Sequence, residues 1–248
     1  MNESRPPSSK STQRPQAAKR LMDLACVILT LPATLPLMAG IAAVTWAIQG
    51  APVLFRQQRP GLHGRPFMIY KFRTMRELRE DGPQSDAERL TGFGRFLRST
   101  SLDELPELFN VIKGDMSLVG PRPLLMKYLQ HYTPELQRRH DVLPGITGWA
   151  QVNGRNTLDW GRRFAMDLWY VDHRSIVLDM KILFLTVWKV LTRDGVVEPG
   201  SPSSTEDFNG LQTNHPYDDQ HNDRFPNQSS DVVEKRSSHS RVMPRAVL

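Results

Sequence analysis

A long block without any charged residue lies near the start of the chain, between Leu24 and Ile48. At about 25 residues and about 1.5 Å per residue, a helix here would extend roughly 37 Å, more than the hydrocarbon core of a bilayer. The apolar core of a signal peptide is shorter than this. The block therefore predicts a membrane segment.

Basic residues flank this block on both sides. Lys19 and Arg20 precede it, and Arg56, Arg59 and Arg65 follow it. Because basic flanks mark the cytoplasmic face of a membrane, both ends are expected on the same side. This favours a monotopic protein at the cytoplasmic face of a membrane, in contact with its lipids.

Two prolines, Pro32 and Pro36, lie in the middle of the block. Each removes a backbone donor and clashes with the preceding turn, so a bend is expected. We therefore favour a re-entrant helical hairpin over residues 19–50. The alternative is an ordinary kinked transmembrane helix. Asp23 is expected to stay at the interface, paired with Lys19 or Arg20.

Composition divides the rest of the chain. Residues 1–18, rich in Ser, Pro, Gln and Arg, predict a disordered arm, and residues 211–248, rich in Asn, Gln, Ser and Asp, a disordered tail. Residues 51–210 predict one catalytic domain on the cytosolic face. The net charge of +6 favours anionic partners, and the single cysteine, Cys26, excludes a disulfide framework.

The predicted domain is mainly α with a few short strands (α+β). Residues 53–55 and 66–70 read as strands around a turn at residues 60–64, and helices dominate after residue 101. The segment 179–193 predicts a helix with a wide apolar face and basic residues alongside. It is either an amphipathic helix in the membrane interface or a core helix of a soluble domain.

The densest group of reactive side chains lies at residues 98–110. Ser101 with Glu104 three residues later fits a capping box at a helix start. The alternative is catalytic: an ionised Asp103 at a helix start is a usable nucleophile towards phosphorus, or a ligand for Mg²⁺.

Basic residues in other segments are suited to phosphate oxygens, Arg through its bidentate fork. The candidates for binding a substrate phosphate or nucleotide are Lys71, Arg73, Arg98, Arg122 and Arg155. The sequence contains no Walker A motif, dinucleotide fingerprint, HExxH or GxSxG.

Taken together, the basic-flanked apolar block and the segments 71–75, 101–123, 144–155 and 164–170 resemble the bacterial sugar transferases called monotopic phosphoglycosyl transferases. The resemblance covers about residues 19–210. Residues 203–210 are similar to small single-domain members that handle bacillosamine-type UDP-sugars.

The resemblance implies a re-entrant helix broken by a Ser-Pro pair, an Asp-Glu dyad, Mg²⁺ and a covalent phosphosugar intermediate. Carried over to this chain, the break falls at Pro36, with Leu35 before it and Thr34 one residue further back. The dyad is Asp103-Glu104, which would also hold the metal.

The implied reaction moves a phosphosugar from a UDP-sugar to undecaprenyl phosphate and releases UMP, as the first step of lipid-linked glycan assembly. Asp103 would attack the β-phosphate, and Glu104 would serve as a metal or proton-handling partner. The donor is expected to be UDP-N,N'-diacetylbacillosamine or another N-acetylated UDP-sugar. Asp167 is a secondary candidate, and a local salt bridge is its alternative role.

Two other functional classes are weighed against this enzyme. The first is a non-catalytic membrane-anchored adaptor of a glycan assembly complex, which would use the same apolar block. The second is a basic nucleic-acid-binding protein, but no recognised motif interleaves aromatic with basic residues. We therefore expect no nucleic-acid partner.

Overall fold

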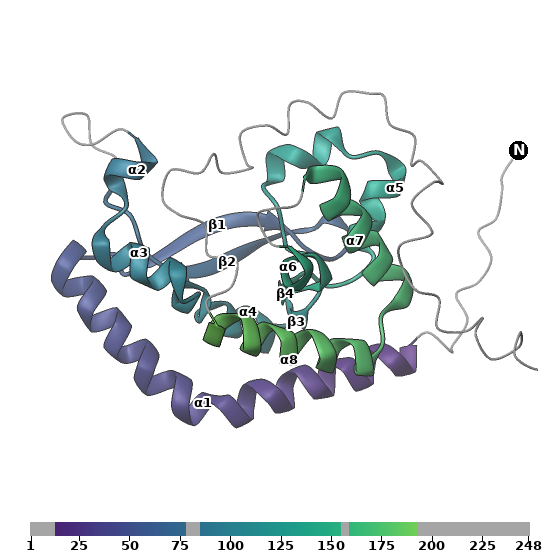
Figure 1. Cartoon of the computed structure of the whole chain (residues 1–248), viewed down its shortest axis with the longest axis horizontal. Coiled ribbons are helices and arrows are strands. Elements are labelled where there is room, and N and C mark those ends of the chain that lie inside the picture. The colour runs from purple at the N-terminus through teal and green to yellow at the C-terminus, as the bar shows by residue number, and fades with distance from the viewer. Residues whose placement is uncertain (1–12, 78–84, 155–158, 193–248) are drawn as a thin grey trace, which may run out of the picture. The chain divides into compact units, whose positions relative to one another are not determined.

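The computed structural model describes residues 13–77, 85–154 and 159–192. These residues form a mainly helical unit with two small two-stranded sheets, which confirms the predicted fold class (Figure 1). All of them belong to one compact unit, residues 1–210. The predicted tail and Arg155 lie outside the described residues.

The apolar block forms one long helix, α1 (Gln13–Gln49), with both prolines inside it. The helix begins within the segment predicted to be a disordered arm, so residues 13–18 are helical instead. Figure 1 shows α1 as an open bend, with its two halves running along the same side of the domain. The hydroxyls of Thr30 and Thr34 donate to carbonyls in the preceding turn, a contact that also favours bending.

Both halves of α1 pack against the domain with a narrow inner face. In the first half Val27 contacts a core that includes Val111 and Met116, and in the second half Met38 and Ile41 pack in another core cluster. Of the described helices, α1 alone is long and apolar enough to cross a membrane. Because the inner face of α1 packs on the domain both before and after the bend, the two halves of the helix are fixed to the domain.

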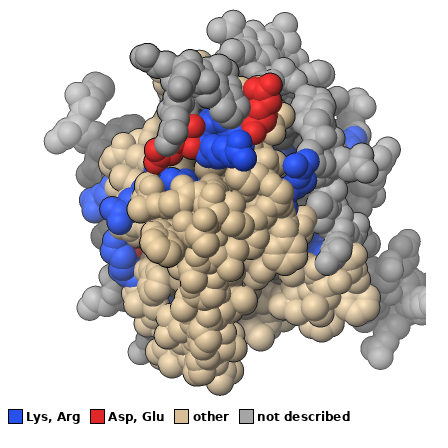
Figure 2. Space-filling model, turned by 90° about the vertical axis from the view of Figure 1, so that its left-hand side faces the viewer, with Lys and Arg blue, Asp and Glu red and all other residues tan. Residues whose placement is uncertain are grey.

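The outer face of α1 is apolar and exposed. Its exposed side chains are Leu21, Ile28, Leu29, Leu35, Leu37, Val44, Trp46 and Ile48. Figure 2 shows a broad area without charged residues on one side of the molecule, with basic residues along its margins. Such a surface is typical of a membrane-bound protein.

An antiparallel hairpin packs above α1. It consists of β1 (Leu54–Pro60) and β2 (Pro66–Phe72), with the short 3-10 helix η1 (Leu62–Gly64) at its turn. This confirms that two strands flank the predicted turn, although β1 continues to Pro60, well beyond the predicted residues 53–55. The register pairs Phe55 with Lys71 and Arg59 with Phe67, so Arg59 and Lys71 project from the same face of the hairpin.

The chain then forms the elements that carry the reactive segment. They are α2 (Asp86–Arg89), α3 (Gly92–Ser99), η2 (Leu102–Glu104), α4 (Glu107–Lys113) and β3 (Ser117–Val119). Strand β3 pairs in parallel with β4 (Gly145–Thr147). A Cβ on Gly145 would lie 2.1 Å from the backbone N of Gly120, so only glycine fits this close approach beside Arg122.

Helices complete the unit. They are η3 (Met126–His131), α5 (Pro134–Gln137), η4 (Arg138–His140), α6 (Trp149–Asn153), α7 (Trp160–His173) and α8 (Ile176–Thr192). Helix α8 buries Ile182 in the core and exposes a row of large apolar side chains that includes Phe184 and Trp188. One face of α8 is therefore core, and the other face is free to contact a membrane.

Lys19 and Asp23 of α1 bind the domain through buried carboxylates. Lys19 Nζ lies 2.7 Å from Asp179 of α8, and Asp23 accepts a hydrogen bond of 2.7 Å from the hydroxyl of Ser117. Asp23 is 1% exposed. The expected ion pair of Asp23 with Lys19 or Arg20 is not formed: Lys19 and Arg20 have other partners, and Ser117 and Leu118 hold the carboxylate of Asp23 inside the domain.

Candidate active site

The reactive segment makes a sharp turn between α3 and α4. Ser101 has a φ of 57°, in the left-handed region that non-glycine residues rarely adopt, and its side chain makes no capping hydrogen bond. The capping box predicted for Ser101 and Glu104 is therefore wrong. The strained turn instead places the short η2 helix, with Asp103 and Glu104, above strand β2. Strain of this kind is often found at functional sites.

Asp103 is a buried carboxylate, 9% exposed, that forms no hydrogen bond or ion pair with any described residue. Burial, and then the neighbouring charge of Glu104, raise its pKa to about 6. Lys71, Arg122 and Arg98 lie close enough to oppose this rise. The side chain thus keeps its lone pairs available while cations surround it.

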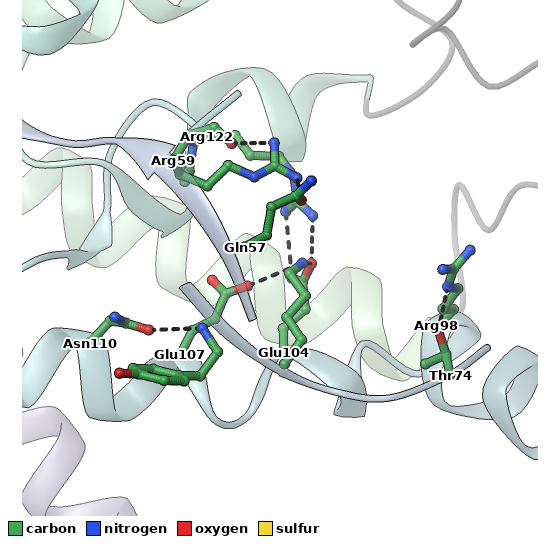
Figure 3. Close-up of polar contacts among 11 residues, drawn as sticks. Gln57, Arg59, Thr74, Arg98, Glu104, Glu107, Asn110 and Arg122 are labelled. Carbon is green, nitrogen blue, oxygen red and sulfur yellow. Dashed lines mark hydrogen bonds and ion pairs between the residues drawn. The ribbon is translucent and has the colours of Figure 1, made fainter. Parts of the chain in front are cut away.

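Two cations, Lys71 and Arg122, bind Glu104, and Figure 3 shows the contact with Arg122. Lys71 Nζ lies 2.5 Å from its Oε1, and Arg122 donates to both carboxylate oxygens. Burial alone would raise the pKa of Glu104, but Arg122 and Lys71 outweigh it and hold the pKa well below its usual range. The adjacent acids therefore have environments that move their pKa values apart, an arrangement typical of acid–base or nucleophile pairs.

A third carboxylate, Glu107 at the start of α4, joins this cluster and was not predicted from the sequence. It is 2% exposed, and its Oε1 lies 3.1 Å from Lys71 Nζ. Burial, and then the charge of Glu104, raise the pKa of Glu107 to about 7. The ammonium group of Lys71 therefore bridges two carboxylates. The spacing of Glu104 and Glu107 at i and i+3 is the one signal that places both near the same partner.

The other predicted phosphate-binding residues divide into two groups. Arg98 lies near Asp103, and its Nε donates to Thr74 at 3.0 Å. Arg122 has a side chain that is 43% exposed and could reach a substrate. Arg73 instead donates to the carbonyls of Gln49 and Gly50, at the C-terminal end of α1. The structure therefore places Arg73 at a helix end, outside the cluster around Asp103.

Asp167, the secondary candidate, lies in a buried ion pair. Its Oδ2 accepts from Nε and Nη2 of Arg139 at 2.9 Å and 2.7 Å, and both residues are almost fully buried. Arg139 also donates to the backbone carbonyl of Arg122 at 3.1 Å. This pair fits the alternative role, a local salt bridge, and it supports the turn that carries Arg122.

Arg20, predicted to flank the membrane helix, also binds backbone groups of the domain. Its guanidinium donates to the carbonyls of Val111 and Ile112, near the C-terminal end of α4. Together with Lys19, it joins the first half of α1 to α4 and α8. Arg155 lies outside the described residues.

The side chains around Asp103 could supply only some of the ligands of a metal ion, so the substrate and water would have to supply the others. Within the described ranges, no three acidic, histidine or cysteine side chains converge as metal ligands. Mg²⁺ does not require three, because it is usually held by one or two carboxylates together with substrate phosphates and waters. Asp103 has free lone pairs for this purpose, while Glu104 is already engaged by Lys71 and Arg122.

Comparison with known proteins gives a consistent result. The model of a family described as bacterial sugar transferase matches residues 14–193. An uncharacterized sugar transferase of Bacillus subtilis, EpsL, is 54% identical over 180 residues, which cover 72% of this chain and 89% of the relative.

Two relatives have more specific names. The UDP-glucose:undecaprenyl-phosphate glucose-1-phosphate transferase of Caulobacter vibrioides is 42% identical, over 71% of this chain and 70% of its own length. The undecaprenyl-phosphate galactose phosphotransferase of Salmonella typhimurium is also 42% identical, but the match covers only 41% of its length.

Proposed function

The chain belongs to the bacterial sugar transferase family, and from this premise we propose that it transfers a sugar phosphate from a UDP-sugar to undecaprenyl phosphate and releases UMP. The names of its relatives support both substrates. The observation that carries the proposal is the buried Asp103 carboxylate, which has no partner among the described residues and lies among cations.

The chemistry proceeds in two displacements at one phosphorus. An oxygen of Asp103 attacks the β-phosphorus of the UDP-sugar, and the bond to the bridging oxygen breaks so that UMP leaves. A phosphate oxygen of undecaprenyl phosphate then attacks the same phosphorus and releases Asp103. Asp103 suits this role better than Glu104, because its lone pairs are free and its higher pKa makes it the better nucleophile.

The cations around Asp103 support both displacements electrostatically. Lys71, Arg98 and Arg122 would neutralise the negative charge that develops on the phosphate oxygens. Lys71 and Arg122 are held in place by Glu104, so they need little rearrangement during the reaction. Glu104 thus organises the cationic side of the site.

Mg²⁺ remains part of the proposal. Asp103 would hold it together with phosphate oxygens of the substrate, and Glu104 would contribute Oε2, which accepts only from Arg122 at 3.5 Å. When bound, it supplies Lewis-acid stabilisation of the charge on the phosphates.

We propose that the enzyme acts at the cytoplasmic face of the inner membrane and that α1 is its re-entrant anchor. The open bend of α1, its packing on one domain from both halves and its apolar outer face support this. The acceptor is a membrane lipid, so an anchored domain brings Asp103 within reach of its phosphate. The product would start the assembly of a lipid-linked glycan.

The test is UMP release by the detergent-solubilised full chain, supplied with undecaprenyl phosphate and Mg²⁺. The donor panel includes UDP-glucose, UDP-galactose and N-acetylated UDP-sugars, because the donor sugar is itself a prediction. We expect one donor to give UMP, and Asp103→Asn to abolish its release. Asp172→Asn is the matched control, since this exposed aspartate lies away from the cluster.

The intermediate has its own readout. Donor alone should leave one phosphosugar on wild-type protein, detectable by intact-protein mass spectrometry and absent from Asp103→Asn. Folded, membrane-bound protein that releases UMP from no donor would contradict the enzyme and favour the adaptor. Full activity of Asp103→Asn would remove this residue from the mechanism.

A further inference from the structure

Arg59 lies near the end of β1, outside the reactive segment of residues 98–110. Its side chain nevertheless lies beside Arg122, one of the two cations that bind Glu104. It projects from the same face of the hairpin as Lys71, because residues of a strand alternate between faces. Figure 3 shows its side chain beside that of Arg122, while Arg98 lies further away, beside Thr74.

The charge of Glu107 acts on the guanidinium of Arg59, but the two side chains do not form an ion pair. Among the described residues it forms no ion pair, and it donates only to Gln57 Oε1 at 2.6 Å and to the carbonyl of Pro123 at 3.3 Å. Its Nε is buried without a hydrogen-bond acceptor. The other central cations differ: Lys71 contacts Glu104 and Glu107, and Arg122 contacts Glu104.

Two arginines side by side repel each other, and the charge of Glu107, which acts on both of them, offsets this only in part. Burial, and then the charge of Arg122, lower the pKa of Arg59 to about 10. Arg59 nevertheless stays charged at neutral pH, with donor capacity to spare. A guanidinium fork with free N–H groups beside a second guanidinium fits phosphate oxygens, which accept bidentate, charge-assisted hydrogen bonds.

We propose that Arg59 is a phosphate-binding residue of this site, which holds the oxygens of a substrate phosphate together with Arg122. The inference rests on the proposed function for the identity of that phosphate. The shared chemistry is a phosphate oxygen, and it comes either from the diphosphate of the UDP-sugar or from the monophosphate of the polyprenyl acceptor. Gln57 and the Pro123 carbonyl position the side chain for this contact.

Direct binding tests the proposal without turnover. The full chain in lipid nanodiscs is titrated calorimetrically with UDP, and separately with a short-chain polyprenyl phosphate. Arg59→Gln keeps a donor for the Pro123 carbonyl and removes the charge, whereas Arg59→Lys keeps the charge and removes the fork. Arg56→Met is the matched control, because this arginine lies on the opposite face of β1, over the ring of Tyr70.

We expect Arg59→Gln to weaken one of the two ligands about tenfold or more, as the loss of a charge-assisted contact predicts. Arg59→Lys should recover part of the affinity, and Arg56→Met should bind within twofold of wild type. Weaker UDP assigns the contact to the donor, and weaker polyprenyl phosphate assigns it to the acceptor. In steady state the matching KM should rise more than kcat falls, which a purely structural role would not produce.

Unchanged binding of both ligands by Arg59→Gln, in protein with a wild-type melting temperature, would overturn the proposal. An equal loss in Arg56→Met would also overturn it, because the effect would then be general. The binding experiment can fail or succeed independently of the test of the proposed function. If wild-type protein released no UMP from any donor, the enzyme would be in doubt, while UDP binding by these variants would still show whether Arg59 contacts phosphate.

Discussion

Two neighbouring carboxylates in one short helix have different environments. Glu104 accepts from Lys71 and Arg122, which hold it ionised, while Asp103 is buried without such a partner. An attacking carboxylate must be ionised and free, and of these two acids only Asp103 combines free lone pairs with a pKa close to neutral. The division of roles follows from the contacts and does not depend on which acid comes first in the chain.

The pH dependence of UMP release follows from this difference. The pKa of Asp103 is raised to about 6, and the reactive form is the carboxylate. The rate of the first displacement should therefore fall as the pH drops through about 6 and level off above about 7. Single-turnover UMP release between pH 5 and 8 measures this, and a flat profile would contradict the assignment.

Glu104→Gln sharpens the same measurement. The negative charge of Glu104 raises the pKa of Asp103, so its removal should move the acid limb of the profile to lower pH. This shift is expected even if the variant is slower, because Lys71 and Arg122 would then act on Asp103 alone. An acid limb that stays at the same pH, or moves upward, would show that another group titrates.

Sequence reasoning found the centre of the site but not all its members. Asp103, Glu104, Lys71 and Arg122 were predicted, and the structure brings them together. Glu107 and Arg59 were missed because their importance depends on burial and on partners from other strands, which a motif does not show. Ser101 was misread: η2 begins directly after it, but a capping residue normally has extended backbone, whereas Ser101 has a φ of 57° and its side chain makes no capping hydrogen bond.

At the scale of elements, arginines join the ends of helices to the rest of the domain. Arg20 donates to carbonyls near the end of α4, and Arg73 donates to carbonyls at the end of α1. Last-turn carbonyls lack partners within their own helix, so a buried guanidinium can satisfy them. The sequence shows such arginines only as basic residues, and for this reason Arg73 was predicted to bind phosphate.

This placement predicts a contrast between two arginines. Arg73→Met should lower the melting temperature, because it leaves the partly buried carbonyls at the end of α1 without a donor. It should leave the affinity for UDP within about twofold of wild type. Arg98→Met should do the reverse, with little change in melting temperature and weaker UDP binding. Differential scanning fluorimetry and calorimetric titration measure the two effects, and weak UDP binding by a stable Arg73→Met would restore its role in the site.

The contacts between η4 and α7 offer a further matched pair. The buried pair of Arg139 and Asp167 and the exposed pair of Arg138 and Asp172 join the same two elements. Removing one partner of a buried pair leaves an uncompensated charge, so Arg139→Met should cost about 3–5 kcal/mol of unfolding free energy. Arg138→Met should cost less than about 1 kcal/mol. Denaturant unfolding measures both, and equal costs would contradict this account.

For the molecule as a whole, the exposed apolar surface of α1 is what separates this chain from a soluble enzyme. The residues on its inner face are fixed by the domain, and those on its outer face contact no described part of the chain. The outer face of α8 is also apolar, and α8 is joined to the start of α1 through Lys19 and Asp179. A bilayer surface is the environment that suits both faces.

The global architecture was more predictable than its boundaries. The long apolar helix, the β-hairpin and the mainly helical region after residue 101 follow from strong local patterns and were confirmed. The start of α1 was placed too late, because the polar residues 13–18 carry no apolar period, although the helix continues through them. The burial of Asp23 could not be foreseen, since its partner Ser117 is distant in the sequence.

The course of α1 through the bilayer is the last prediction, and it concerns the whole molecule. If the bend at Pro32 and Pro36 makes the helix re-entrant, both ends of the chain lie on the cytoplasmic side. Cysteines placed one at a time at Ser4 and Ser240, in a Cys26→Ser background, should then resist a membrane-impermeant maleimide in spheroplasts and react after lysis. The block is long enough to span once straightened.

Replacing both prolines with alanine tests the cause of that topology. Alanine restores the backbone donors and favours a straight helix, so the cysteine at Ser4 should become reactive from outside while the one at Ser240 stays protected. Packing of both halves of α1 on the domain opposes this change, so a partial shift is the expected result. Labelling of the Ser4 cysteine from outside with both prolines present would show a spanning helix. The domain would then hold α1 by its second half alone, because Val27 could not stay in the core that it shares with Val111.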